Sequence, residues 1–234
     1  MVEPGKLCSV QSIAQMIDIS AVRTDSTDNK VEEAVRWAKQ SNCYLVTILP
    51  SQTVRVKMLL GGSTVLKIGG NVGFPSGGQT TKIKVLETRE LVEMGVDEID
   101  MVIDVAALLS GRYEDVYRDI QAVVDASERK PVKVILECNY LNASQIRIGC
   151  DLAIKAEASY VKTGTGWAPT GATLENIELI KKHVGERIGI KASGGIRSIE
   201  SLLAMYRLGA RRFGISLTSA SRILDTATKL LYPL

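Results

Sequence analysis

The sequence has 234 residues, of which 45% are hydrophobic and 24% are charged, a composition typical of an ordinary soluble globular protein. This balance excludes intrinsically disordered, collagen-like and low-complexity chains. The formal net charge of +3 suits a small anionic substrate, but it is too weak to indicate a nucleic-acid-binding protein.

The chain carries no obvious signal for a membrane or for export. Its apolar runs are shorter than the about 20 residues that a transmembrane helix needs, and residues 1–6 lack the apolar core of a signal peptide. The four cysteines show neither a CxxC pair nor zinc spacing, which favours reduced thiols: Cys8, Cys43, Cys138 and Cys150. We therefore expect a cytoplasmic protein.

The composition contains one histidine, His183. It follows two lysines where a helix is predicted to end, a place where a cation meets the helix dipole favourably. Metal centres built on several histidines are excluded, and a Ser-His-Asp triad would need this one residue at the site. Acid–base chemistry in this chain must use Lys, Asp, Glu, Tyr or Cys, and we expect no metal and no cofactor.

Apolar, β-branched segments alternate with helical patterns along the whole sequence. The candidate strands, in chain order, are Met16–Ser20, Cys43–Leu49, Val65–Val72, Glu98–Ile103, Val132–Glu137, Ser159–Thr165, Gly189–Gly194 and Arg211–Ser216. Apolar stripes with helical spacing lie between strands, for example Val31, Ala34, Val35 and Ala38, then Val116, Ile120 and Val123, then Ile199, Leu202, Leu203 and Tyr206. Ser198, with Glu200 in the first turn, marks a helix start, and the last helix is predicted over about 219–231.

Eight strands, each followed by a helix, predict a (β/α)₈ TIM barrel of the α/β class. The strand starts are roughly 20–35 residues apart, the length of a βα unit. A doubly wound open sheet is the alternative. No linker or shift in composition divides the chain, so we expect a single barrel domain over residues 1–234.

Charged residues interrupt four of these apolar strands. Because alternate residues of a barrel strand point inward, four consecutive strands aim these side chains into one lumen: Asp100, Lys133, Glu137, Lys162 and Lys191. Asp104 has the same alternation as Asp100. The alternative for each lysine is a strand end that reaches water. A buried group of opposite charges is typical of an active site.

Two lysines beside a carboxylate indicate a particular chemistry. A lysine amine has a reference pKa of about 10.4, and burial beside another ammonium can lower it toward about 7–8. The neutral amine attacks a carbonyl to form an imine, which then withdraws electrons from the neighbouring carbon. The pattern therefore indicates an imine-forming aldolase.

Glycines follow the last two strands, where barrels commonly bind phosphate. Ser193-Gly194-Gly195 leads into a helix, and Gly214-Ile215-Ser216 ends the eighth strand. Backbone N–H groups at such glycines and helix starts bind phosphate, although tight turns are the alternative reading. A further glycine-rich loop, residues 73–78, follows the third strand on the same face.

These motifs closely resemble the 2-deoxyribose-5-phosphate aldolases, a family of class I aldolases with a (β/α)₈ barrel. The strongest matches are Val72-Gly-Phe-Pro75, Glu98-Ile-Asp-Met-Val-Ile103, Val132-Lys-Val-Ile-Leu-Glu137, Tyr160-Val-Lys-Thr163 and Lys191-Ala-Ser-Gly-Gly-Ile-Arg197. The resemblance implies cleavage of 2-deoxy-D-ribose 5-phosphate to acetaldehyde and D-glyceraldehyde 3-phosphate.

By position, the resemblance makes Lys162 the imine lysine, Asp100 the proton-transfer carboxylate and Lys191 the second lysine. The substrate-binding candidates are Asp18, Lys133, Thr165, Gly194, Gly195, Gly214 and Ser216.

The sequence departs from the family pattern near the predicted substrate. The family usually has a serine where this chain has Gly164, Phe or Lys at Trp167, and a second serine at Leu217. An aldolase of the same chemistry with another sugar phosphate or aldehyde is therefore an alternative, and a noncatalytic sugar-phosphate-binding barrel is a third. The oligomeric state stays open, with a homo-oligomer among the options, as do the roles of Tyr232 and Cys138.

Overall fold

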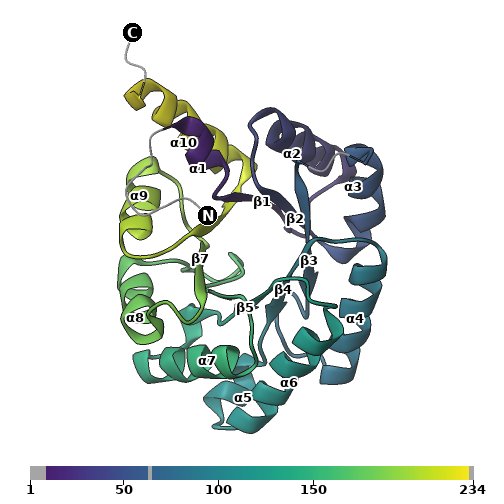
Figure 1. Cartoon of the computed structure of the whole chain (residues 1–234), viewed down its shortest axis with the longest axis vertical. Coiled ribbons are helices and arrows are strands. Elements are labelled where there is room, and N and C mark those ends of the chain that lie inside the picture. The colour runs from purple at the N-terminus through teal and green to yellow at the C-terminus, as the bar shows by residue number, and fades with distance from the viewer. Residues whose placement is uncertain (1–8, 63–64, 232–234) are drawn as a thin grey trace.

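The computed structural model describes residues 9–62 and 65–231. Eight strands pair in parallel in sequence order, and β8 also pairs with β1, so the sheet closes into a barrel. Figure 1 looks along this barrel and shows the helices as an outer ring around the strands. The predicted TIM barrel is confirmed, and the open doubly wound sheet is wrong because a closed sheet has no edge strand.

The strands are short and mostly buried. Their bounds are β1 (Ile17–Ala21), β2 (Leu45–Ile48), β3 (Lys67–Val72), β4 (Glu98–Val102), β5 (Val132–Ile135), β6 (Tyr160–Lys162), β7 (Gly189–Ser193) and β8 (Arg212–Ser216). Five of them (β2, β4, β5, β6 and β7) end before the predicted boundary, because the chain turns away from the sheet into the loops above it. Those loops begin at the carboxyl ends of the strands, where the polar side chains gather.

Helices separate the strands. Their bounds are α1 (Val10–Ala14), α2 (Asp28–Gln40), α3 (Thr53–Leu60), α4 (Thr81–Glu93), α5 (Val105–Leu109), α6 (Tyr113–Ala126), α7 (Ala143–Lys155), α8 (Leu174–Val184), α9 (Ile199–Arg207) and α10 (Leu217–Leu231), with short 3₁₀ turns η1 (Pro50–Gln52) and η2 (Cys138–Tyr140). The last helix begins directly after β8, two residues before the predicted position. None of the helices within residues 9–62 and 65–231 is long and apolar enough to cross a membrane.

Side-chain caps explain where several helices begin. Ser198 accepts a hydrogen bond from the N–H of Ser201, which confirms the predicted start of α9. Asn142 and Gln145 form a reciprocal capping box at α7. These side chains satisfy N–H groups that have no partner within the helix, so the turns above the barrel are fixed in place.

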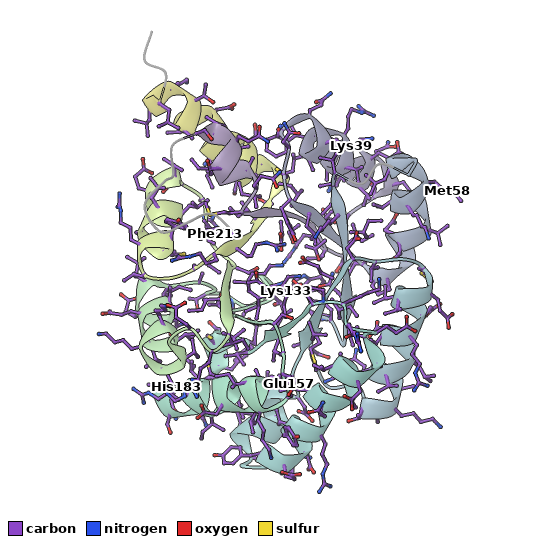
Figure 2. The ribbon with its side chains drawn as sticks, in the orientation of Figure 1. Lys39, Met58, Lys133, Glu157, His183 and Phe213 are labelled. Carbon is purple, nitrogen blue, oxygen red and sulfur yellow. The ribbon has the colours of Figure 1, made fainter. Side chains whose placement is uncertain are left out.

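The two faces of each strand differ in chemistry. Val132 and Val134 on β5 belong to the apolar core shared with the helices. Lys133, between them, is also fully buried, but it points to the other face of the strand, into the barrel. Figure 2 shows Lys133 in the middle of the barrel, while Met58 and His183 lie on the outer helices. The barrel therefore has an apolar layer beneath its helices and a charged interior.

One buried ion pair lies outside the barrel interior. Lys84 on α4 is fully buried, and its Nζ lies 2.5 Å from Asp119 Oδ2 on α6 and 2.9 Å from the Val102 carbonyl oxygen. Thr81 donates to the other oxygen of Asp119 at 2.9 Å. This lysine has its own carboxylate, so the pair ties α4 to α6 without leaving an uncompensated buried charge.

Candidate active site

Lys162 is the last residue of β6 and points into the barrel. It is 3% exposed, and its Nζ donates to Asp100 Oδ2 at 2.7 Å. In the strand register it lies between Ile135 on β5 and Lys191 on β7. Its position at the carboxyl end of a barrel strand is the usual place for catalytic side chains.

Asp100 connects three lysines. It is fully buried on β4; its Oδ1 accepts from Lys133 at 2.8 Å, and its Oδ2 accepts from both Lys162 and Lys191 at 2.7 Å. Burial favours the neutral carboxyl, but the charges of Lys133, Lys162 and Lys191 outweigh it and hold the pKa of Asp100 well below its usual range. Asp100 is therefore an ionised carboxylate among three amines when no substrate is bound.

A second carboxylate, Asp18 on β1, faces the same cluster from the opposite side. Its Oδ1 accepts from Arg212 Nε at 3.1 Å, and its Oδ2 lies 2.7 Å from Lys191 Nζ. The second contact is an ion pair by distance only: among the described residues, no donor has hydrogen-bond geometry toward Asp18 Oδ2. Burial raises the pKa of Asp18, and Arg212 and Lys191 overcome that effect and lower it.

Glu98 at the start of β4 completes a closed circuit. Its Oε2 lies 2.7 Å from Lys133 Nζ and 3.1 Å from Arg212 Nη2. Cations and anions then alternate around a ring, which we call the charge ring, consisting of Arg212, Asp18, Lys191, Asp100, Lys133 and Glu98. Every carboxylate in it lies between two cations, and every cation lies between two carboxylates.

Lys162 stands outside this circuit. The charge ring has three positive and three negative groups, so it is neutral, and Lys162 shares Asp100 with ring members rather than having a carboxylate of its own. Burial, together with the charges of Lys191 and Lys133, lowers the pKa of Lys162 to about 8 despite the attraction of Asp100. Such a lysine is partly neutral, and nucleophilic, near neutral pH.

Glu137, which was predicted in the lumen, and Asp104, which shares the alternation of Asp100, are not part of this cluster. Because β5 ends at Ile135, Glu137 leaves the strand alternation and adopts a left-handed conformation with φ of 55°. Its carboxylate accepts from the Thr165 N–H at 3.2 Å and from the Thr165 hydroxyl. Asp104 follows the end of β4 and caps α5 through the Ala107 N–H at 2.9 Å. The expectation of one lumen was wrong for Glu137, because β5 is shorter than predicted.

The glycine-rich ends lie on the same side of the barrel as Lys162. Gly194 and Gly195 follow β7 with φ of 94° and 82°, a conformation that suits glycine, and space is open around the Cα of Gly195. Ser216 is exposed at the end of β8 and accepts from the Ser219 N–H of α10 at 3.4 Å. These groups border the amino ends of α9 and α10, where N–H groups favour an anion.

Gly214 lies deeper, within β8. A Cβ atom there would come 2.7 Å from Ser193 Oγ and 3.4 Å from Lys191 Cε. Its missing side chain therefore leaves room for the Ser193 hydroxyl, and Lys191 lies at contact distance beside it. The structure places Gly214 beneath the candidate phosphate groups rather than among them.

Aromatic side chains lie on the loops above the lysines. The Trp167 indole N–H donates to the Val22 carbonyl at 3.2 Å, and its ring stands edge-on to Phe74 with the centroids 6.0 Å apart. The Arg23 guanidinium lies 4.8 Å from the Trp167 ring centroid. Loops after β1, β3 and β6 thus meet at Trp167, which links them across the mouth.

The sequence reasoning missed Arg212 and Glu98. Both carry a signal that the alternation rule contains: Glu98 is two residues before Asp100, and Arg212 is two residues before Gly214. Their places at the first positions of their strands made them resemble strand ends at the surface, yet they are only 3% and 6% exposed.

His183 and the described cysteines are not members of the Lys162 cluster, although the charge of Asp18 acts on Cys43. His183 is in the last turn of α8, as predicted, and its Nε2 lies 2.8 Å from Asp151 Oδ1. Cys43, Cys138 and Cys150 are free and buried, and burial raises the pKa of the Cys43 and Cys138 thiols to about 12. Cys8 and Tyr232 lie outside the described residues. Within residues 9–62 and 65–231, no three His, Cys, Asp or Glu side chains are grouped to hold a metal ion.

Comparison with known proteins agrees with this architecture. A curated deoxyribose-phosphate aldolase of Klebsiella pneumoniae is 44% identical over 213 residues, which cover 90% of this chain and 86% of the relative. One from Methanothermobacter thermautotrophicus is 42% identical over 207 residues, covering 88% of this chain and 92% of the relative. The solved deoxyribose phosphate aldolase of Aeropyrum pernix, described as tetrameric, is 29% identical and covers 96% of this chain and 94% of its own, with a TM-score of 0.87.

The family model matches most of the barrel. It describes the DeoC/LacD family aldolases and extends over residues 12–216, from α1 to the end of β8. The matched region contains Lys162, Lys191 and Asp100. The chain therefore belongs to the DeoC/LacD aldolase family.

Proposed function

We propose that this chain is a class I aldolase that cleaves 2-deoxy-D-ribose 5-phosphate to acetaldehyde and D-glyceraldehyde 3-phosphate through an imine on Lys162. The observation that carries the proposal is the state of Lys162. This buried lysine lies 2.7 Å from Asp100, shares that carboxylate with two other lysines, and has a pKa of about 8.

Imine formation needs a neutral amine and two proton transfers. The Lys162 Nζ attacks C1 of the open-chain aldehyde, and the resulting carbinolamine loses water to give a protonated imine. Asp100 accepts the hydrogen bond from Nζ and so aims its lone pair. Lys191, bound to the same Asp100 oxygen, can supply the proton that the departing hydroxyl needs.

Carbon–carbon cleavage then uses the imine as an electron sink. Removal of the proton from the C3 hydroxyl breaks the C2–C3 bond, releases D-glyceraldehyde 3-phosphate and leaves an enamine on Lys162. Protonation at C2 and attack by water release acetaldehyde and restore the amine. The strongly lowered pKa of Asp100 means that Asp100 holds a transferred proton only transiently, so we assign it a relay role with Lys191.

We assign phosphate binding to the groups above β7 and β8. The Gly194 and Gly195 backbone and the Ser216 hydroxyl lie beside the amino ends of α9 and α10, which favour negative charge. Asp18 is our candidate for a substrate hydroxyl, since its Oδ2 lacks a hydrogen-bond donor among the described residues. Lys133 supports Asp100, and Thr165, whose N–H and hydroxyl bind Glu137 on the loops above the barrel, is our candidate for a further substrate contact.

A different sugar phosphate or aldehyde is the second candidate substrate. It is favoured by three positions near the mouth: Gly164 has no hydroxyl, Trp167 links three loops, and Leu217 stands at the first turn of α10. These residues surround the region where the substrate's outer part would lie. They are not members of the hydrogen-bonded set of Lys162, Asp100 and Lys191, so they bear on which substrate is bound rather than on imine chemistry.

Steady-state cleavage rates test both candidates. The panel contains 2-deoxyribose 5-phosphate, ribose 5-phosphate, unphosphorylated 2-deoxyribose and other short sugar phosphates. We expect the highest kcat/KM for 2-deoxyribose 5-phosphate and a large loss without the phosphate. A higher kcat/KM for another member of the panel would replace the proposed substrate, and binding without turnover of any member would favour the noncatalytic barrel.

We further propose a single cytoplasmic domain over residues 1–234 that forms a homo-oligomer. Exposed apolar side chains on the outer face of the barrel support association: Val54 and Met58 on α3 are 50% and 74% exposed, and Ile83 and Leu86 on α4 are each 50% exposed. Light scattering after size exclusion measures the mass in solution, and Met58→Glu should reduce it if this face is the contact.

A further inference from the structure

Arg212 occupies the amino end of β8, far down the barrel from the substrate-facing loops. Its guanidinium binds Asp18 Oδ1 on one side and Glu98 on the other. Its Cζ lies over the Tyr44 ring, 3.8 Å from the ring centroid, and 6.0 Å from the Tyr160 ring centroid. It is 6% exposed, and its contacts with Asp18, Glu98 and the two tyrosine rings do not extend to Lys162.

We propose that Arg212 is a positioning residue for Lys162, because it closes the charge ring and thereby leaves Lys162 as the one cation of the cluster without a carboxylate of its own. The inference rests on the proposed function, since it concerns how the imine lysine is kept reactive. It assigns a role to an arginine that does not touch the reacting atoms.

Arg212 acts first by pairing with two carboxylates, Asp18 and Glu98. It takes up Asp18 Oδ1 and one side of Glu98, so neither carboxylate is free to draw Lys191 or Lys133 away from Asp100. With both lysines held against Asp100, its negative charge is already compensated when Lys162 approaches. Asp100 can then orient the Lys162 amine without strongly stabilising the ammonium.

Arg212 also acts through the charge balance of a poorly screened interior. With Lys162 protonated, the cluster holds four cations and three carboxylates; with Lys162 neutral, it holds three of each. An uncompensated charge is expensive when buried, so the proton that the cluster loses most readily is the one on Lys162. Without Arg212, a protonated Lys162 would itself balance the three carboxylates.

The other charged groups around Lys162 are either members of the charge ring or bound to other partners. Those on the strands that enclose it are Asp18, Glu98, Asp100, Lys133, Lys191 and Arg212, and those nearby are Glu137 above β5 and Lys67 at the start of β3, where Lys67 binds the Tyr44 hydroxyl at 2.7 Å. Glu137 is engaged by Thr165, and Lys67 by Tyr44. Neither forms an ion pair with a member of the charge ring.

Four variants test the charge balance: two change the net charge of the cluster and two keep it. Arg212→Met removes one positive charge, Arg212→Lys keeps it, Glu98→Gln removes one negative charge, and the double variant Arg212→Met/Glu98→Gln restores the original surplus. Arg211→Met is the matched control. Arg211 adjoins Arg212, but it faces outward, donates to the Tyr206 carbonyl oxygen at 2.9 Å and stacks on the Tyr206 ring at 4.7 Å.

The measurement is the pH midpoint of Lys162 acetylation by trace acetic anhydride, followed by mass mapping, on folded enzyme without substrate. The pH profile of kcat/KM for 2-deoxyribose 5-phosphate is recorded in parallel. Because acetylation needs no turnover, a parent enzyme that does not cleave the sugar would contradict the proposed function while leaving the inference about Arg212 open to direct measurement.

We expect opposite shifts from opposite charge changes. Arg212→Met should raise the Lys162 midpoint by on the order of one pH unit, a tenfold loss of neutral amine at pH 7, and Glu98→Gln should lower it. Arg212→Lys, the double variant and Arg211→Met should stay near the parent. Unchanged Lys162 midpoints in both Arg212→Met and Glu98→Gln would overturn the proposal. If Arg212→Met does not fold, an unchanged midpoint in Glu98→Gln overturns it alone.

Discussion

Lys162 and Lys191 lie directly opposite each other in the parallel register of β6 and β7. Two ammonium groups at paired positions repel each other, and here both donate to the same oxygen of Asp100. The partners are not equivalent, because Lys191 also has Asp18 at 2.7 Å. The register thus produces one well-compensated lysine and one that readily loses its proton.

The first prediction concerns the identity of the covalent lysine. Lys162→Arg should abolish turnover while preserving the fold, because a guanidinium stays protonated and cannot form an imine. Borohydride reduction of the parent enzyme with substrate, followed by mass mapping, should place the modification on Lys162. Modification of Lys191 or Lys133 instead would give the covalent role to that residue.

The second prediction concerns proton transfer. Asp100→Asn keeps the size of the side chain but removes the charge that aligns Lys162 and relays protons. We expect kcat to fall by at least about 10²-fold, the low end for a positioned acid–base group. Circular dichroism checks that the variant is folded. Near-parental kcat in a folded Asp100→Asn enzyme would remove Asp100 from the mechanism.

The third prediction concerns the pH dependence that Lys191 imposes. Because the pKa of Lys162 is about 8, the neutral fraction falls tenfold for each pH unit below that value. Lys191→Leu removes a neighbouring positive charge and should raise the pKa of Lys162, moving imine formation to more alkaline pH. Lys191→Arg keeps the charge and should move it less.

Single-turnover borohydride trapping against pH distinguishes these outcomes. The apparent midpoints belong to the coupled cluster rather than to one residue, so the comparison between Lys191→Leu and Lys191→Arg carries the test. A lower plateau with the parent's midpoint in Lys191→Leu would show that Lys191 contacts the substrate without activating Lys162.

The fourth prediction concerns stability. Lys162→Met removes the surplus cation and leaves the charge ring intact, so we expect the free energy of unfolding at pH 7 to rise by about 1–3 kcal/mol. Lys133→Met leaves Asp100 and Glu98 short of a cation and should lower it by about 3–5 kcal/mol. Urea unfolding measures both.

The way this stability difference changes with pH follows from the lowered pKa of Lys162. Below about pH 8 the parent carries a buried ammonium that the unfolded chain holds in water. That cost disappears as the pH rises through the unfolded-state pKa of about 10.4. The advantage of Lys162→Met should therefore shrink above pH 8, and a constant advantage up to pH 10.5 would contradict this account.

The fifth prediction concerns Gly164. A Cβ atom there would lie 2.7 Å from Glu137 Oε1, so Gly164→Ala should push the carboxylate off Thr165 and cost about 1–3 kcal/mol of unfolding free energy. In a Glu137→Ala background the same substitution should cost little, because the clash is gone. Equal costs in both backgrounds would show that Glu137 is not what restricts position 164.

The alternation of side chains along apolar strands correctly predicted much of the site. Asp100, Lys133, Lys162 and Lys191 were expected to share one lumen, and hydrogen bonds join all four. Glu137 was expected in the same lumen, which was wrong, and Asp104 on the face of Asp100 also lies outside the cluster. Their strands end earlier, and a left-handed turn or a helix cap redirects them.

What the sequence alone determined was the barrel and the presence of charges inside it, because both follow from local periodicity. The tertiary structure decided how the charges pair. Arg212 and Asp18 are 194 residues apart along the chain, and they meet only because β8 closes onto β1. Ion pairing depends on distances across the closed barrel, which no local pattern contains. Closure therefore decides which lysine lacks a carboxylate of its own.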